Sequence, residues 1–155
     1  MAVVSNSSPP EQQKIALEQI GQLGLLHQLF HEILIPPAVA REAAASVAGQ
    51  EWIHVQSLAE PVLLEAMRPG LGAGEREALS LAAEIRANAV IVDDDAARRI
   101  GLRLGLPVIG TAGVLLLAKE RGYTRAVRPH LIALIEAGFY LSPALVDLIV
   151  KRAAE

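Results

Sequence analysis

Three consecutive carboxylates, Asp93, Asp94 and Asp95, directly follow the apolar run at 89–92. The run does not alternate with polar residues, which is typical of a strand buried on both faces in a parallel sheet. Ligands of open α/β sheets bind just beyond the carboxyl ends of such strands. Because hard cations such as Mg²⁺ take oxygen ligands, these acids are placed where they could hold a divalent cation. Their position therefore favours metal-dependent chemistry.

Further polar side chains are expected at the same edge of the sheet. The carboxyl ends of parallel strands lie along one edge, which also receives the first turns of neighbouring helices. Asn6 ends the first predicted strand, and predicted helices bring Glu42, Glu75 and Glu77. Glu42 and Glu77 border the inward stripes of their helices, where an unpaired carboxylate is costly. A shared metal ion would offset that cost.

Each of these residues also has an ordinary structural explanation. Glu75 and Glu77 sit in a predicted first turn, where a carboxylate complements the helix dipole. Asp95 is predicted to be the N-cap of the next helix and is not counted as a ligand. Glu42 could pair with an arginine at the surface, and Asn6 could bond to nearby backbone in a turn. The metal hypothesis therefore depends on several of these side chains converging.

Strands and helices alternate along nearly the whole chain. Strands are expected at 2–5, 33–35, 52–55, 89–92, 108–109 and 139–141, and helices at 11–30, 36–47, 61–67, 75–87, 95–104, 112–121, 126–137 and 142–153. The first helix has weak points at Gly21 and Gly24, and Thr111 is predicted to cap the helix at 112–121. The pattern predicts an α/β fold, a three-layer α/β/α sandwich around a mainly parallel central sheet, in a single domain over 1–155.

The composition excludes several classes of function. Of the 155 residues, 52% are hydrophobic but only 3% aromatic, so the core must consist of Ala, Leu, Val and Ile. The chain has no cysteine, which excludes disulfides, zinc thiolate sites and thiol catalysis. A net charge of -3 argues against non-specific coating of nucleic acid, although a local basic patch could still meet RNA. No apolar run has the length of a membrane span, so we expect a cytoplasmic protein without membrane contact.

A few residues near the acids could contact a substrate. Arg98 and Arg99 lie one turn past the acids and could bind RNA phosphates, since guanidinium groups contact phosphates bidentately. The alternative is a solvated helix face. Thr111 could orient a ligating carboxylate or a water molecule, or could act only as a helix cap.

Other signals carry less weight. His27 and His31 have the i, i+4 spacing of zinc ligands, but no third ligand is evident. The glycines at 70, 72 and 74 resemble a phosphate-binding loop only superficially, because no strand leads into them and two glutamates would repel the phosphate.

Five short segments occur in a fixed order along the chain. They are VVSNSSP at 3–9, IPPAV at 35–39, GEREAL at 74–79, VDD at 92–94 and VIGTAGVL at 108–115. Together they resemble the PIN-like family of prokaryotic proteins related to the toxin ribonucleases of toxin–antitoxin pairs. The resemblance covers nearly the whole chain. It implies a PIN fold and Mg²⁺- or Mn²⁺-dependent cleavage of RNA phosphodiester bonds.

The resemblance also implies a ligand set. Carried over residue by residue, the metal-binding and catalytic positions are Asn6, Glu42, Glu77 and Asp94, with Asp93 as the close rival of Asp94. Most active PIN nucleases have an aspartate at the first position, whereas this chain has an asparagine. An amide oxygen can ligate a cation but adds no formal charge. A second departure is the segment 10–13, which looks like an insertion beside the site.

These observations leave three hypotheses about function. The first is a metal-dependent ribonuclease of toxin type, for which the resemblance implies a small antitoxin as partner. The alternative, favoured by Asn6, is a PIN-fold module that has lost cleavage and binds RNA or a protein. A third is a phosphatase-like hydrolase with Asp93 as nucleophile and Asp95 as second acid, although such enzymes usually carry that pair on the first strand.

The last predicted helix has an apolar stripe that contains Leu145, Leu148 and Ile149. This stripe could form a homodimer face or belong to the core of the domain. We predict that it belongs to the core.

Overall fold

The computed structural model describes residues 2–4, 15–59 and 70–155. Asn6 and the helix predicted at 61–67 lie outside the described residues. The strands are β1 (Ala2–Val4), β2 (Ile33–Ile35), β3 (Ile53–Val55), β4 (Ala89–Ile91) and β5 (Val108–Ile109). The helices are α1 (Ala16–Gln19), α2 (Gly24–Phe30), α3 (Pro37–Glu42), α4 (Ala44–Val47), α6 (Ala73–Ile85), α7 (Asp95–Arg103), α8 (Thr111–Glu120), α9 (Arg128–Glu136) and α10 (Pro143–Arg152).

The five strands form one parallel sheet in the order β3-β2-β1-β4-β5. From β1 the chain adds β2 and then β3 on one side of β1, and it later adds β4 and β5 on the other side. The order of the strands therefore reverses between β1 and β4, which is where open α/β sheets place their ligands. In the register of the sheet, Val4 of β1 lies beside Ile91, two residues before Asp93.

Side chains of the strands enter two separate cores on opposite faces of the sheet. Val4 and Ile91 belong to one core, whereas Val3 and Val90 belong to the other. This alternation follows from the two-residue period of a strand. Both sets are nearly or completely buried, as expected of strands covered on both faces.

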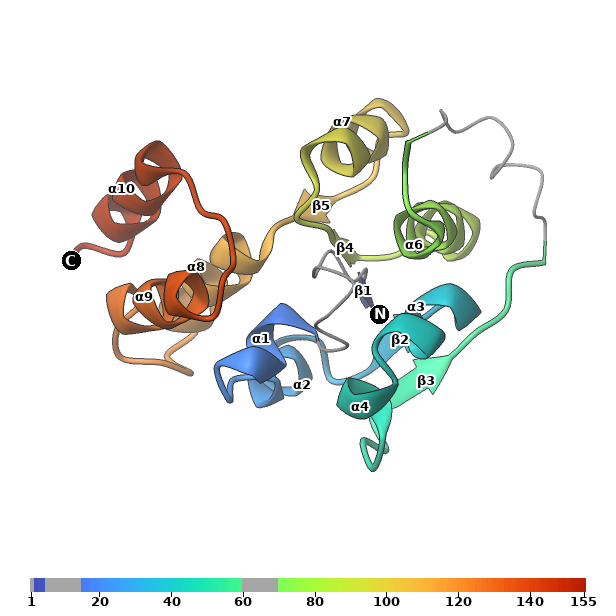
Figure 1. Cartoon of the computed structure of the whole chain (residues 1–155), viewed down its shortest axis with the longest axis horizontal. Helices are drawn as coiled ribbons and strands as arrows, with labels where there is room; N and C mark the ends of the chain where they lie inside the picture. The colour runs from blue at the N-terminus through green and yellow to red at the C-terminus, as the bar shows by residue number, and fades with distance from the viewer. Residues whose placement is uncertain (1, 5–14, 60–69) are drawn as a thin grey trace.

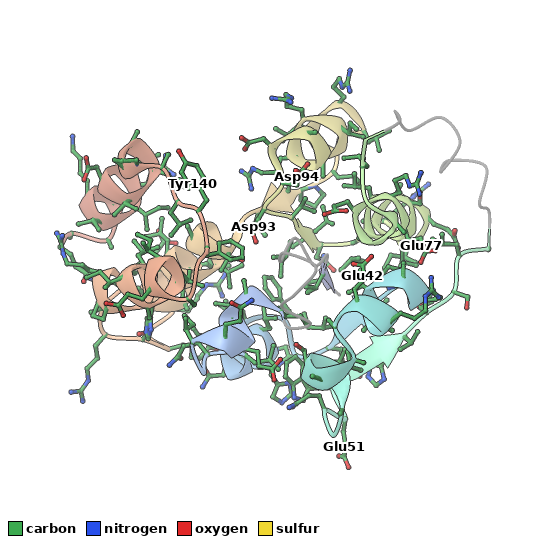
Figure 2. The ribbon with its side chains drawn as sticks, in the orientation of Figure 1. Glu42, Glu51, Glu77, Asp93, Asp94 and Tyr140 are labelled. Atoms are coloured by element: carbon green, nitrogen blue, oxygen red, sulfur yellow. The ribbon has the colours of Figure 1, made fainter. Side chains whose placement is uncertain are left out.

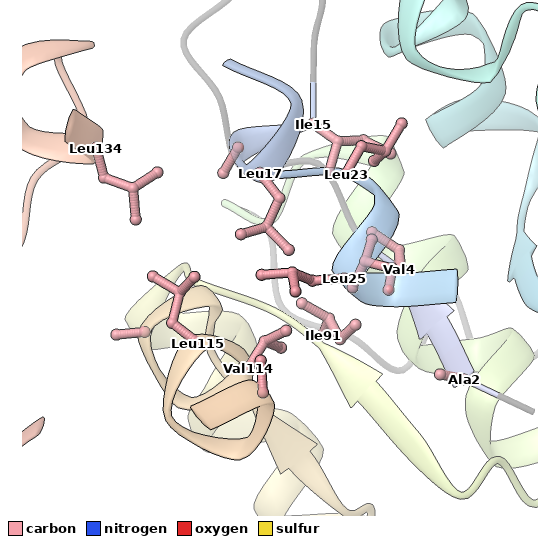
Figure 3. Packing of buried hydrophobic residues seen from close by; sticks show 14 of the residues in the cluster. Ala2, Val4, Ile15, Leu17, Leu23, Leu25, Ile91, Val114, Leu115 and Leu134 are labelled. Carbon is pink, nitrogen blue, oxygen red and sulfur yellow. The ribbon is translucent and has the colours of Figure 1, made fainter. Parts of the chain in front are cut away.

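Helices cover both faces, as Figure 1 shows: α6 and α7 lie on one side of the sheet, and α1, α2 and α8 on the other. In the larger core, Leu17 and Leu25 from α1 and α2 approach Val114 and Leu115 from α8 around Ile91 (Figure 3). The prediction of a three-layer α/β/α fold with a parallel sheet is confirmed. None of the described helices combines the length and apolar character needed to cross a membrane.

Two helices predicted as continuous are divided. The helix predicted at 11–30 is represented in the described residues by α1 and α2, and Gly21 between them has a φ of 68°. This break agrees with the predicted weak point. The helix predicted at 36–47 is wrong as a single element, because Ala43 leaves helical geometry with φ -119° and ψ 34°. The side chain of Ala43 is completely buried, and the break redirects α4 so that Ser46 is buried as well.

Ser46 explains why the chain turns at that point. Its hydroxyl accepts a hydrogen bond from the Ile15 amide at 2.7 Å and donates one to the Glu18 carboxylate. These bonds link α4 to the start of α1, which is 28 to 31 residues away in sequence. A contact over that separation is invisible to local helix patterns.

The strand predicted at 139–141 is also wrong. The Phe139 amide donates to the Leu134 carbonyl and closes the end of α9, after Gly138 has turned the backbone to a φ of 91°. A positive φ at this position is typical of helix ends that finish with glycine. Tyr140 then projects into solvent, 84% exposed.

The stripe on α10 is only partly a core element. Ile149 is buried, but Leu145 and Leu148 remain 37% and 48% exposed. The prediction that the whole stripe belongs to the core is therefore wrong for these two leucines.

Glu155 fixes the C-terminal part of the fold. Its carboxylate accepts hydrogen bonds from the Val127 amide at 2.7 Å and the Arg128 amide at 3.5 Å, at the start of α9. It also pairs with Lys119 of α8 at 3.1 Å. These contacts, led by the Val127 amide, hold the pKa of Glu155 below its ordinary value of 4.5.

A glutamate with a lowered pKa stabilises the folded state above its ordinary pKa, and this contribution is lost as the pH falls through the lowered value. We therefore expect Glu155→Gln, which keeps an acceptor but loses the charge, to be less stable than the wild type at pH 7. The difference should disappear on acidification below 4.5. Urea unfolding at a series of pH values measures it. Glu120→Gln, at an exposed position of α8, is the control, and an equal pH dependence of both variants would contradict the prediction.

Candidate functional site

Several helices begin at the carboxyl edge of the sheet. α3, α7 and α8 follow β2, β4 and β5 directly, and α6 runs back toward the start of β4, so that its first turn lies at the same edge. The first turn of every helix has backbone N–H groups without partners inside the helix. Figure 2 shows Glu42, Glu77, Asp93 and Asp94 on the elements around this edge. Each of these acids accepts a hydrogen bond from a helix N-terminus, as follows.

Glu77 caps α3 from outside that helix. α3 begins after Pro36, and its first residue is Pro37, so neither residue offers a side-chain acceptor or an N–H group. Ala38 is thus the first donor of α3, and its amide donates to Glu77 Oε2 at 2.7 Å. The Pro-Pro sequence makes the cap depend on another helix.

Glu42, the last residue of α3, contacts α6 in return. Its Oε1 accepts a hydrogen bond from the Gly74 amide at 3.2 Å, in the first turn of α6. A Cβ atom on Gly74 would overlap the Glu42 carboxylate. Any side chain at position 74 would therefore require the Glu42 carboxylate to shift.

Glu75 folds back over the start of its own helix. Gly72 is the N-cap of α6, and Glu75 occupies the third helical position, from which a glutamate can reach the N-cap amide. A Cβ atom on Gly72 would overlap the Glu75 carboxylate. The glycines at 72 and 74 therefore leave room for the carboxylates of Glu75 and Glu42. The comparison with a phosphate-binding loop did not predict this role.

Asp94 is the N-cap of α7. Its backbone is extended, and its Oδ1 accepts a hydrogen bond from the Ala97 amide at 2.8 Å. The prediction that Asp95 is the N-cap is wrong, because Asp95 is already the first helical residue. An N-cap side chain reaches an amide only from the extended residue that precedes the helix.

Asp93 binds the start of α8. Its Oδ1 accepts the Thr111 amide at 2.7 Å and its Oδ2 accepts the Thr111 hydroxyl at 2.6 Å. Gly110 is the N-cap of α8, so the prediction of Thr111 as the cap is wrong. Thr111 instead orients a carboxylate, which was the other role considered for it. Burial raises the pKa of Asp93, while the bonds from Thr111 and the charge of Arg98 oppose that rise.

Several carboxylates at this edge interact electrostatically. Burial is the main cause that raises the pKa of Glu42, the charge of Glu75 adds to it, and Glu77 adds a smaller effect. Burial also raises the pKa of Glu75, and here the charge of Asp94 adds to it. Glu75 therefore interacts electrostatically with Glu42 and with Asp94.

Glu75 was not among the ligands that the resemblance implied. The structure agrees with its ordinary explanation, because Glu75 lies in the first turn of α6, where an acid complements the helix dipole. The signal that could have revealed more is the spacing Gly72-x-x-Glu75, because a glycine N-cap leaves room for the returning carboxylate. We call Glu42, Glu75 and Asp94 the acidic line.

The two predicted substrate-binding arginines of α7 differ in their surroundings. Arg98 turns inward, and its Nη1 donates to the Val92 carbonyl at 3.1 Å, whereas Arg99 is exposed. His27 does not act with His31 as a side-chain pair: its Nδ1 lies 2.6 Å from the His31 backbone carbonyl, and its ring stacks on Trp52.

The acidic line has the donor chemistry that hard divalent cations require, namely several carboxylate oxygens in a part-buried setting. The charge of Glu75 raises the pKa of Glu42, and the charge of Asp94 raises the pKa of Glu75, so a bound cation would reduce an existing repulsion. Within 2–4, 15–59 and 70–155, no three His, Asp or Glu side chains are arranged so as to hold a metal ion. Asn6, the further ligand implied by the resemblance, lies outside those ranges.

Comparison with known protein families matches residues 2–155 to the family described as a PIN domain. No curated protein and no solved structure matches the chain.

The overlap at Gly74 leads to a stability prediction. Gly74→Ala should destabilise the protein by about 1 kcal/mol, because loss of the Glu42 bond outweighs the gain of about 0.5–1 kcal/mol that alanine brings to a helix. Gly24→Ala in α2, where a Cβ would meet nothing within 4 Å, is the matched control and should be neutral or stabilising. Chemical denaturation measures both variants.

The double variant Gly74→Ala/Glu42→Ala tests the cause. Removal of the Glu42 carboxylate removes the overlap, so the two substitutions should cost less together than the sum of the single effects. If the two losses of unfolding free energy add strictly, the overlap between a Cβ at position 74 and the Glu42 carboxylate is not the cause of the destabilisation.

Proposed function

Because this chain belongs to the PIN domain family, whose fold is of nuclease type, we propose that it is a divalent-metal-dependent ribonuclease. The single observation that carries the proposal is that Glu42, Glu77 and Asp94 each accept a hydrogen bond from a helix N-terminus at the same edge of the sheet. These side chains belong to helices at the edge where the strand order reverses, which is the usual ligand position in such sheets.

In this proposal Glu42, Glu77 and Asp94 would hold Mg²⁺ or Mn²⁺ together with the amide oxygen of Asn6, as the family resemblance implies. A bound divalent cation supplies Lewis acidity, which activates water and stabilises the negative charge that develops on a phosphodiester. Asp93 contributes less directly, because both of its oxygens accept hydrogen bonds from Thr111. Asp93 and Thr111 together fix the end of β4 against α8.

The substrate would approach past α7. Arg99 is exposed five residues after Asp94, and its guanidinium is available to an RNA phosphate. Arg98 has a different function in the proposal, because it holds the Val92 carbonyl and stands beside Asp93. It would stabilise the site rather than bind the substrate.

The biological role that we propose follows from the family resemblance. A ribonuclease of this type would be the toxin of a toxin–antitoxin pair, restrained by a small antitoxin that covers the acidic line. The partly exposed Leu145 and Leu148 of α10 are compatible with a homodimer as well.

A second candidate function is a PIN module that binds RNA or a protein without cleavage. Asn6 is the observation that favours it, because an asparagine at the first position supplies one negative charge fewer than an aspartate. A weaker metal site would still attract phosphate groups. It would activate water less effectively.

We expect Glu42→Gln and Asp94→Asn to weaken Mn²⁺ binding by roughly 10- to 100-fold, the range typical of damage to the surroundings of a metal site. RNA cleavage should fall in parallel. Calorimetric titration with Mn²⁺ and cleavage of a labelled RNA measure the two effects. Asp147→Asn, on an exposed face of α10, is the control. Mn²⁺ binding without cleavage in the wild type would favour the non-catalytic module, and no binding at all would refute the metal site.

Asn6→Asp should raise both the affinity for Mn²⁺ and the rate of RNA cleavage, because it restores the missing negative charge. The comparison uses the same RNA, metal concentration and pH for both proteins. Equal or lower activity of the variant would count against a ligand role for position 6.

A further inference from the structure

Tyr140 has an aromatic ring that lies mostly in solvent. The sequence has two tyrosines, two phenylalanines and one tryptophan, and all five lie within the described residues. Tyr140 is 84% exposed and Tyr123 is 45% exposed, whereas the phenylalanines and the tryptophan are partly buried. Packing of the core therefore does not account for the position of the Tyr140 ring.

The backbone on both sides of Tyr140 is fixed. Phe139 and Leu141 are partly buried against the larger core, and the Phe139 amide closes the end of α9. Ser142 is the N-cap of α10, and its hydroxyl accepts a hydrogen bond from the Leu145 amide at 3.2 Å. The ring is thus presented to solvent from a segment that is held at both ends, so little entropy is lost when a ligand binds it.

Contacts at the far end of α8 show where Tyr140 lies. Glu155, which follows α10, accepts a hydrogen bond from the Val127 amide before α9 and pairs with Lys119 near the end of α8. The end of α8, the start of α9 and the end of α10 therefore lie together. The opposite end of these three helices holds the start of α8, the end of α9 and the start of α10. The segment 137–142, which contains Tyr140, joins the last two.

The start of α8 belongs to the carboxyl edge of the sheet. Thr111, the first residue of α8, donates hydrogen bonds from its amide and its hydroxyl to Asp93. α8 and α10 have ten residues each, or about 15 Å of helix, so that the start of α10 lies at the level of the start of α8. Figure 2 shows Tyr140 on the side of α10 that faces α7. The exposed ring therefore borders the edge at which the acids lie.

A flat, exposed ring at this edge suits a base of a single-stranded nucleic acid. Bases stack on aromatic side chains with little regard to sequence, because every base has a π-face. Stacking needs no positive charge, which matters in a chain with a net charge of -3. A duplex keeps its base faces within its own stack, so such a contact selects single strands.

We propose that Tyr140 is a substrate-binding residue on which a base of single-stranded RNA stacks, beside the phosphodiester at the carboxyl edge of the sheet. This inference rests on the proposed ribonuclease function. It goes further, because it assigns a contact to a base and restricts the substrate to single strands. Arg99 of α7 would contact a phosphate of the same strand.

Substitutions at position 140 test the contact. We expect Tyr140→Ala to bind a labelled single-stranded RNA roughly 5- to 150-fold more weakly, the range for one lost base stack, and Tyr140→Phe to bind it within about threefold of the wild type. Fluorescence anisotropy without divalent metal measures the affinity. With Mn²⁺, Tyr140→Ala should raise the KM for RNA cleavage by a similar factor and leave kcat nearly unchanged.

Tyr123→Ala is the matched control. Tyr123 is also exposed, but it follows α8 at the opposite end of the three helices, where its amide donates to the Ala118 carbonyl. This variant should bind and cleave RNA like the wild type. Equal thermal unfolding of Tyr140→Ala and the wild type shows that the fold is intact.

An abasic strand separates stacking from contacts to phosphate. It keeps the phosphates of the same oligonucleotide but offers no base to the ring, so the wild type and Tyr140→Ala should bind it equally. The salt dependence of RNA binding should be the same in both proteins, because no charge is removed, whereas Arg99→Ala should flatten it. If Tyr140→Ala weakens binding of the abasic strand as much as binding of the intact strand, the ring does not stack on a base.

The measurements distinguish the failure of each idea. If the wild type binds single-stranded RNA through Tyr140 but cleaves none with Mn²⁺, the ribonuclease function fails and the stacking contact is supported. If RNA is cleaved but Tyr140→Ala equals the wild type in affinity and KM, the stacking contact is refuted, and the ring is left for a protein partner. A wild type that neither binds nor cleaves single-stranded RNA overturns both.

Discussion

Helix N-termini that gather at one edge of a parallel sheet impose the main constraint on this molecule. Each first turn has N–H groups that must find acceptors, and a carboxylate is the strongest acceptor that a side chain offers. Glu77, Glu42, Asp94 and Asp93 meet this need for α3, α6, α7 and α8 in turn. The topology therefore concentrates acids at the edge before any ligand is considered. A cap of this kind contributes about 1 kcal/mol.

The same concentration has an electrostatic cost. Burial and neighbouring charges raise the pKa of Glu42 and Glu75, although backbone amides oppose both rises. Helix N-termini thus hold the carboxylates individually, and repulsion acts between them. A cation would relieve that repulsion without disturbing the caps, since each carboxylate oxygen has more than one lone pair. Capping and metal binding are in this way compatible roles for one side chain.

Two of the carboxylates pack against glycines. Gly72 and Gly74 lie in the first turn of α6, and a Cβ at either position would overlap an acid. The aliphatic cores behind the edge keep these elements in register: Val4 and Ile91 fill one side of the sheet, and Val3 and Val90 the other.

The sequence alone was enough to predict the alternation of strands and helices, the parallel sheet and the edge at which Asp93 and Asp94 lie, because apolar period and strand ends are local properties of the chain. Only the folded arrangement settled which acid meets which helix. The break at Ala43, the loop at 139–141 and the N-cap role of Asp94 rather than Asp95 escaped prediction as well. The bonds that orient Glu42 and Glu77 join residues 32 and 39 positions apart. Local spacing shows which side chains could reach the edge, whereas their direction there follows from the packing of distant helices.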